Sequence, residues 1–228
     1  MTRLAPTDAV DPVSIDVVLR RASAGLPCWV GDQAGGRRPV PIGRWMGGVW
    51  ASTEDRRADR AVLNACRGPT LDVGCGPGRF TAGLARLGLE ALGVDTSATA
   101  VELTIDRGGA ALQRDVFAPL PGRRHWARVL LVDGNIGIGG DPLRVLRRAR
   151  ELLTPDGVVI AEVDPSTRTG LHVELRRWET ETLTGNWFQW ASVGLGATGE
   201  VAHAAGLRVS EVVETSGRYF VRMVRDRL

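Results

Sequence analysis

The sequence predicts an α/β protein with a doubly wound sheet of about seven strands, mostly parallel, that ends in an antiparallel hairpin at one edge. Strand and helix patterns alternate at short spacing from 69 to 163, which is typical of parallel strands joined by crossover helices. The segment 126–133 is almost entirely apolar, as expected for a strand buried on both faces. Two alternating segments with a short connection then close the chain, which indicates an antiparallel pair.

A chain of 228 residues is long enough for a single domain with a sizeable core. We expect four parts within that domain. Residues 1–52 form an N-terminal cap, with one helix at about 14–24, and 53–163 form the α/β core. Residues 164–198 are an insert on the substrate side, and 199–228 supply a last helix and the hairpin.

Each core element follows from a local pattern. Ser52 or Thr53 caps a helix that has acids in its first turn, and Gly88 ends the next helix. The expected helices are 53–66, 78–88, 98–109, 142–157 and 200–207, and the expected strands are 69–73, 89–95, 110–117, 126–133, 157–163, 208–215 and 218–224.

Composition argues against several classes of partner. All the basic residues are arginines, but they alternate with acids and the net charge is only +3, so we expect no nucleic-acid partner. No apolar run is long enough for a transmembrane helix, and the acidic, proline-broken start is unlike a signal peptide, so we expect no membrane partner and a cytoplasmic location. The three cysteines are far apart and are expected to be free thiols.

The stretch LDVGCGPGRF, residues 71–80, joins a strand to a helix through three glycines, Gly74, Gly76 and Gly78. In open α/β sheets such a loop binds a nucleotide-like cofactor at the carboxyl edge of the strands. The dinucleotide fingerprint needs a small residue at position 79, where helix and strand pack closely. Arg79 stands there instead, which disfavours a nicotinamide-dependent dehydrogenase.

Acids follow three successive strands. Asp72 lies at the end of the first, and Asp95 ends the second, about 20 residues beyond the first glycine, where a carboxylate can accept the hydroxyl hydrogens of a ribose. Asp115 follows the third, where it can accept from the exocyclic amine of an adenine, with Val116 and Phe117 beside the ring. The three together are more specific than any one of them.

The ordered motifs LDVGCGPG, GVDTS, RDVF, LLVDGNIG and LLTPDGVVIAEV resemble those of class I S-adenosylmethionine-dependent methyltransferases, over about 53–163. The resemblance implies a Rossmann-like fold and S-adenosylmethionine as the cofactor. It places the two first glycines near the methionine part, Asp72 at the loop or the methionine amine, and 133–136 at the inner wall of the pocket. The implied cofactor-binding residues are Asp72, Gly74, Cys75, Gly76, Asp95, Thr96, Asp115, Val116, Asp133, Gly134 and Asn135.

The acceptor is expected to be a small molecule in biosynthetic metabolism. Nucleic-acid amino-methyltransferases carry an (Asp/Asn/Ser)-Pro-Pro-aromatic motif after the fourth strand, and here the stretch 133–142 reads DGNIGIGGDP. In it, Asp141 and Pro142 start a helix, and the glycines at 137–140 are expected to leave room for a substrate. Catechol-type relatives hold magnesium with an Asp-Asn pair after strand five, and the sequence there is EVDPS, so we expect no metal.

Two residues are candidates for catalysis. His172 lies in the insert, which should hang over the carboxyl edge of the sheet, and Asp133 ends the fourth strand at that edge. Trp45 from the N-terminal segment and Trp187 and Trp190 from the insert are candidates for an apolar lid over the substrate. The same tryptophans would also suit an ordinary small core between cap and insert.

Two other functions remain open from the residues alone. One is use of the same cofactor for chemistry other than methyl transfer. The other is a non-catalytic cofactor-binding or scaffold protein, which the lack of an obvious base suggests. The chain is expected to be a monomer or a homodimer, because an exposed hairpin at a sheet edge can pair with a second copy.

Overall fold

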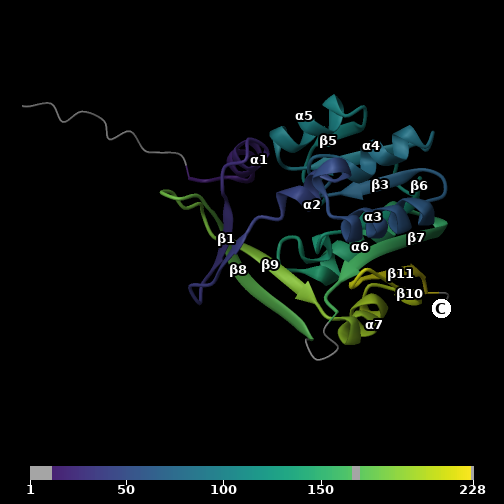
Figure 1. Cartoon of the computed structure of the whole chain (residues 1–228). Coiled ribbons are helices and arrows are strands. Elements are labelled where there is room, and N and C mark those ends of the chain that lie inside the picture. Colours follow the sequence, from purple (N-terminus) through teal and green to yellow (C-terminus); the bar gives the residue numbers. More distant parts are fainter. Residues whose placement is uncertain (1–11, 166–169, 227–228) are drawn as a thin grey trace, which may run out of the picture.

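The computed structural model describes residues 12–165 and 170–226 and contains two β-sheets (Figure 1). The larger has seven strands in the order β10-β11-β7-β6-β3-β4-β5, and the smaller has four in the order β2-β1-β8-β9. The larger sheet confirms the predicted α/β class. The smaller sheet forms from the two segments that the sequence indicated only as a cap and an insert.

Five strands of the larger sheet are parallel, and the last two strands form the predicted antiparallel hairpin at its edge, in which only the final strand runs opposite to the five. Apolar strands and crossover helices of this kind bury both faces of a parallel sheet. The strands are β3 (Thr70–Val73), β4 (Ala91–Asp95), β5 (Ala110–Gln113), β6 (Trp126–Leu131), β7 (Leu153–Val163), β10 (Leu207–Thr215) and β11 (Arg218–Arg225).

Helices cover both faces of this sheet (Figure 1). They are α3 (Thr53–Ala65), α4 (Arg79–Arg86), α5 (Ala98–Asp106), α6 (Pro142–Leu152) and α7 (Leu195–Ala204). Ser52 caps α3 by accepting from the Asp55 amide at 3.0 Å, and Asp141 caps α6 by accepting from the Arg144 amide at 2.9 Å. Within the described ranges, no helix is both long and apolar enough to cross a membrane.

Three predicted boundaries are wrong. Helix α6 ends at Leu152 rather than 157, because the chain is already extended through Pro155 and Gly157 as the start of β7. Strand β5 stops at Gln113, so Asp115 lies in the loop that follows it. Helix α7 begins at Leu195, five residues earlier than predicted, where the Thr198 hydroxyl donates to the Gly194 carbonyl at 3.0 Å.

The core lies on both sides of β3, β6 and β7. Leu71, Val129, Leu131 and Ala161 are fully buried against one set of helices, and Leu130 on the alternate face is fully buried against the other. Side chains of this size stabilise the fold by about 1.5–3 kcal/mol each when buried. The apolar run that predicted β6 is therefore explained by burial on both faces.

The smaller sheet joins sequence-distant segments. Strands β1 (Trp29–Asp32) and β2 (Arg37–Pro39) come from the N-terminal part, and β8 (Leu171–Glu179) and β9 (Phe188–Val193) from the insert. Strand β1 pairs antiparallel with β8, with Val30 opposite Trp178. We call this sheet, with helices α1 (Ile15–Ser23) and α2 (Ile42–Met46) and the 3-10 turn η1 (Gly48–Trp50), the cap.

Hydrogen bonds attach the cap to the core. The Asp16 carboxylate on α1 accepts from the Ser97 hydroxyl at 2.7 Å and from the Thr99 amide at 2.8 Å, at the start of α5. On α2, the Met46 carbonyl accepts from the Arg107 guanidinium at 2.6 Å. These contacts hold the cap at the end of the larger sheet where the β3 and β6 loops diverge. That is the point at which strand order reverses and where open α/β sheets bind their ligands.

Candidate active site

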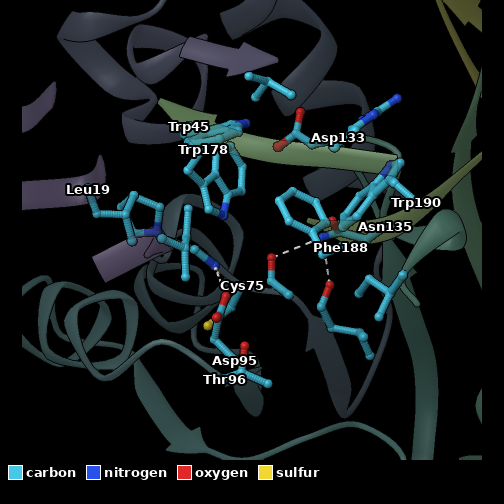
Figure 2. Close-up of a pocket in the computed structure, with 18 of the residues that line it drawn as sticks. Leu19, Trp45, Cys75, Asp95, Thr96, Asp133, Asn135, Trp178, Phe188 and Trp190 are labelled. Atoms are coloured by element: carbon cyan, nitrogen blue, oxygen red, sulfur yellow. Dashed lines mark hydrogen bonds between the residues drawn. The ribbon is translucent and has the colours of Figure 1, made fainter. Parts of the chain in front are cut away.

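A cavity of about 780 Å³ lies between the carboxyl edge of the larger sheet and the cap. Its lower side, which we call the floor, consists of residues 72–76, 94–96, 114–116, 132, 133 and 135, which lie at the carboxyl ends of parallel strands or in the loops that follow them. Its upper side, the roof, consists of four aromatic side chains. They are Trp45, Trp178, Phe188 and Trp190. Figure 2 shows Trp45 and Trp178 on the side of the cavity opposite Cys75, Asp95 and Thr96.

The glycine loop after β3 is locked against the loop after β6. The Asn135 side-chain amide donates to the Val73 carbonyl at 2.8 Å and to the Gly74 carbonyl at 3.0 Å. Gly74 has a φ of +66°, and a Cβ there would lie 2.6 Å from the Asn135 amide nitrogen. Only glycine suits both the left-handed backbone and the close approach of Asn135.

Asp95 lies in the floor beside Thr96, and its carboxylate organises the loops around it. One oxygen accepts from the Gly76 amide and the other from the Ser97 amide, each at 2.9 Å. Burial raises the pKa of Asp95, and these backbone donors oppose the rise. Each carboxylate oxygen can accept more than one hydrogen bond, so both retain capacity for the hydroxyls of a ribose.

Asp72 and Cys75 lie deeper in the floor. The Asp72 carboxylate accepts from the Thr81 hydroxyl at 2.7 Å, which ties β3 to α4, and burial raises the pKa of Asp72 to about 6. The Cys75 sulfur lies 3.7 Å from the Thr104 hydroxyl, and burial raises the pKa of this thiol far above its ordinary value. A thiol held in its protonated form is a poor nucleophile.

Asp115 and Val116 form the far end of the floor. The Asp115 carboxylate accepts from the Phe117 amide at 2.8 Å and is otherwise open to solvent, whereas Val116 is buried. The Arg144 guanidinium lies 3.8 Å from the centroid of the Phe117 ring. This end therefore combines a free carboxylate oxygen with an apolar surface beside it.

Asp133 is held by two arginines. One carboxylate oxygen accepts from the Arg79 guanidinium at 2.6 Å, and the other accepts from the Arg218 guanidinium at 3.1 Å. Its backbone has a φ of +57°, and its amide donates to the Glu162 carboxylate at 2.7 Å. Both oxygens of this carboxylate are therefore occupied by guanidinium groups, which fix it in place.

The two arginines connect the floor to more distant elements. Arg218, on β11, is a bidentate donor to Glu162 at 2.8 and 2.7 Å and lies 3.5 Å from Asp59. Burial opposes its charge, but these carboxylates raise the pKa of Arg218 above its ordinary value. Arg79 also donates to the Arg44 carbonyl of the cap at 2.6 Å. Arg79, which the sequence indicated only as a break in the dinucleotide fingerprint, thus joins the cap to the floor.

The roof is a continuous series of aromatic contacts. The ring centroids of Trp45 and Trp178 are 6.1 Å apart, those of Trp178 and Phe188 are 5.2 Å apart, and those of Phe188 and Trp190 are 6.3 Å apart. The aromatic residues of the N-terminal segment and of the insert therefore meet over the floor. The candidate set from the sequence omitted Trp178 and Phe188. The spacing of Phe188 and Trp190, two residues apart, is typical of one face of a strand and was an available signal.

The remaining candidates lie at the margin of the cavity or outside it. Trp187 lines its mouth, is 41 % exposed and has the Arg177 guanidinium 4.6 Å from its ring centroid. Gly134 lies in the loop after β6 but is not among the lining residues. His172 is exposed on β8, opposite Ser192, and the structure does not bring it to the cavity.

The glycine stretch after β6 has a different function from the one expected. A Cβ at Gly137 would lie 1.8 Å from the Ala191 carbonyl oxygen, and one at Gly140 would lie 2.9 Å from the Gln189 Cβ. These glycines therefore let β9 pack directly against the loop, and the expectation that they leave room for a substrate is wrong. Among the residues that the structure describes, no group of three or more His, Cys, Asp or Glu side chains could hold a metal ion.

Comparison with known proteins agrees with this geometry. Residues 44–212 match the family model described as a methyltransferase domain. The fold is similar to that of an S-adenosylmethionine-dependent methyltransferase from Bacteroides fragilis in complex with S-adenosyl-L-homocysteine. That likeness has a TM-score of 0.73 at 20 % identity and covers 88 % of each chain. No curated protein sequence matches the chain.

Two further solved structures are similar in fold. A Burkholderia thailandensis 1,6-didemethyltoxoflavin-N1-methyltransferase has a TM-score of 0.55 at 21 % identity, over 75 % of this chain and 78 % of that one. The glycopeptide N-methyltransferase MtfA, complexed with S-adenosyl-L-methionine, has a TM-score of 0.57 at 16 % identity, over 74 % and 93 %. The family model spans most of the chain, and the floor with its glycine loop has the expected form. This protein therefore belongs to the S-adenosylmethionine-dependent methyltransferases of class I.

Proposed function

We propose that this methyltransferase acts on a small-molecule acceptor, in biosynthetic metabolism, and that the acceptor binds between the floor and the roof. The observation that carries the proposal is the cavity itself. Its volume of about 780 Å³ falls within the range of roughly 300–1,000 Å³ that is usual for small-molecule sites. A cavity covered by a roof suits a compact acceptor better than a polymer, which needs an open groove.

The floor residues fit the cofactor. Asp95 has remaining acceptor capacity for the ribose hydroxyls, and Asp115 has a free carboxylate oxygen for the adenine amine beside Val116. The left-handed backbone at Gly74 and Gly76 brings main-chain groups to the surface of the floor without side chains in the way. When bound, S-adenosylmethionine supplies a methyl group already activated by its sulfonium.

The protein's own contribution is orientation and exclusion of water. The roof rings cover the space above the floor, and both carboxylate oxygens of Asp133 are occupied by Arg79 and Arg218. Alignment of two bound reactants accounts for much of the rate enhancement in a direct displacement. We therefore propose that Asp133 positions the loop after β6 and does not act as the base.

The relatives support a compact acceptor. The Burkholderia thailandensis structure contains 1,6-didemethyltoxoflavin and S-adenosylhomocysteine, and the name of MtfA gives a glycopeptide as its acceptor. Neither of these acceptors is a nucleic acid. Their identities to this chain are low, so they support the class of acceptor and not its structure.

The first test is calorimetric titration with S-adenosylmethionine, with S-adenosylhomocysteine, and with NAD as the control. We expect saturable binding of the first two alone. An acceptor screen would then follow the release of S-adenosylhomocysteine. Turnover only with proteins or nucleic acids would contradict a small-molecule acceptor, and release of methylthioadenosine would show chemistry other than methyl transfer.

A further inference from the structure

The cavity lacks an evident general base. Within the described part of the chain, no histidine, lysine or tyrosine lines it. Cys75 does line it, but burial raises the pKa of its thiol far above neutrality. Asp72 also lines it, but this residue is only 2 % exposed and its carboxylate accepts from the Thr81 hydroxyl. An acceptor whose reacting atom must first lose a tightly held proton, such as an alcohol, therefore has no accessible side chain beneath the roof to take that proton.

The carboxylates of the upper floor are already engaged. Asp133 accepts from two guanidinium groups, and Glu162 is the bidentate partner of Arg218. Every carboxylate oxygen of these two residues therefore already has a donor.

Each arginine at the wall of the cavity near the roof has an acidic partner. Arg38 and Arg176 share one carboxylate, Glu174, at 3.4 and 2.5 Å, and Arg44 pairs with Asp55 at 2.9 Å. The Arg176 guanidinium also lies 5.6 Å from the centroid of the Trp190 ring. Arg79 is paired with Asp133. The remaining lining arginine, Arg114, lies at the Asp115 end of the floor, away from the roof. No arginine beneath the roof is therefore left without a carboxylate partner to attract an anionic acceptor.

The roof surrounds the other side of this space with aromatic rings. Trp45, Trp178, Phe188 and Trp190 all line the cavity and contact one another in series. The faces of aromatic rings carry partial negative charge and attract cations, by about 0.5–2 kcal/mol per contact, with tryptophan the strongest. The roof rings therefore favour a cation over an anion.

We propose that the acceptor atom is an amine nitrogen carried on an apolar body, and that the roof binds this amine as a cation. The inference rests on the proposed function and names its substrate class. It joins two independent features of the cavity, the absence of an accessible base among the lining residues and the aromatic roof over the acceptor space.

The chemistry balances without a base. In the small fraction of amine that is unprotonated, the nitrogen lone pair forms the new N–C bond as the S–C bond breaks, and the electron pair of that bond goes to sulfur. The positive charge passes from sulfur to nitrogen, and the nitrogen then loses a proton to water. No anion forms at any point, so the site needs no oxyanion donors and holds a cation before and after transfer.

The test compares three probes that share a 2-phenylethyl group, in protein saturated with S-adenosylhomocysteine. They are 2-phenylethylamine, 2-phenylethanol and 3-phenylpropanoate, which are a cation, a neutral molecule and an anion at pH 7. By calorimetry we expect the amine to bind at least about tenfold more tightly than the alcohol, and the carboxylate to bind most weakly. We also expect S-adenosylhomocysteine release from S-adenosylmethionine with the amine and not with the alcohol.

Variants link the preference to the roof. Trp178→Leu should reduce the advantage of the amine over the alcohol by about fivefold or more, and Trp178→Phe, which keeps a ring, should retain most of it. Trp50→Leu is the matched control, because Trp50 is 62 % exposed and does not line the cavity. Unchanged affinity for S-adenosylhomocysteine in each variant shows that the floor is intact.

Several results would overturn the inference. They are equal affinity for the three probes, tighter binding of the carboxylate, methylation of the alcohol rather than the amine, and no saturable binding of the amine. A preference for the carboxylate would indicate that Arg38 and Arg176, rather than the roof, recognise the acceptor. Failure of the protein to bind S-adenosylhomocysteine at all would instead count against the proposed function, so the two failures are distinguishable.

Discussion

The floor and the roof of the cavity are built on different physical principles. The floor is polar and is held by hydrogen bonds to backbone, such as those of Asp95 to Gly76 and Ser97. The roof is apolar and is held by ring contacts between segments far apart in the sequence, as between Trp45 and Trp178. The difference teaches that cofactor binding and acceptor binding can be changed separately, because few interactions are shared between the two sides.

The largest expected effect comes from a residue that supports the floor from beneath. Arg218→Met leaves Glu162, Asp133 and Asp59 without their shared cation, and removal of one partner from a buried ion pair costs about 3–5 kcal/mol. We expect the free energy of unfolding in urea to fall by that amount. Arg222→Met, on the same strand but in the more exposed pair with Glu211, should cost less than about 1 kcal/mol. Equal losses in the two variants would show that burial of the network contributes nothing.

The next largest effect is expected on the affinity for the cofactor, which depends on the floor and not on the roof. Asp95→Ala removes a carboxylate that orders two backbone amides and can accept from the ribose. Hydrogen bonds to a charged group contribute about 1.5–3 kcal/mol each, so two of them correspond to a loss of about 100-fold or more in affinity for S-adenosylmethionine. Calorimetry measures this loss, and the exposed Asp106→Ala is the control. Unchanged cofactor affinity in Asp95→Ala would remove the ribose assignment.

The free energy of unfolding is expected to depend on pH through Asp72 in the floor. Burial raises the pKa of Asp72 to about 6 from an ordinary value of 3.8, so the folded protein binds this proton more tightly than the unfolded chain does. The contribution of Asp72 to stability is therefore complete below about pH 4 and is lost as pH rises through about 6. Each pKa unit corresponds to about 1.4 kcal/mol, so this loss approaches about 3 kcal/mol.

Asp72→Asn should abolish that pH dependence. Urea unfolding at pH 4, 5, 6 and 7 measures it, as the difference between the variant and the natural protein at each pH. The stability of the natural protein relative to the variant should fall steadily across this range. Stability curves that stay parallel would contradict the raised pKa, and Asp106→Asn is the control for a change of surface charge.

The smallest effect is expected at the histidine that the sequence favoured as a base. His172 is exposed on β8 and lies outside the cavity, so His172→Ala should change turnover less than about twofold, within the range usual for surface substitutions. The measurement is the rate of S-adenosylhomocysteine release with an accepted amine. A large loss would mean that the cap moves His172 to the acceptor during turnover.

Much of the floor could be predicted because its signals are local. The three glycines, Asp95 and Asp115 stand at the ends of strands that the hydrophobic pattern locates, and parallel strands bring their carboxyl ends to one edge. The loop after β6 was located in the same way, as was Asn135 within it. What local reasoning missed there was the pairing of Asp133 with Arg79 and Arg218, since those partners come from α4 and β11.

The roof was predicted only in part. The concentration of tryptophan in two segments indicated that Trp45 and Trp190 could meet, but no local pattern showed that β1 would pair with β8. Antiparallel pairing between strands separated by more than a hundred residues depends on how both segments sit on the core. For that reason the sequence alone also kept His172 as a candidate, since its position relative to the cavity depends on the register of β8.

The amino-acid sequence by itself determined the parallel sheet, the glycine loop and the acids at the strand ends, because periodicity and backbone requirements act over a few residues. Three features became visible only in the folded molecule: the two outer segments form one sheet, two arginines bind Asp133, and aromatic rings cover the cavity. Those features depend on contacts between residues far apart in the chain, and such contacts exist only once the core has brought them together.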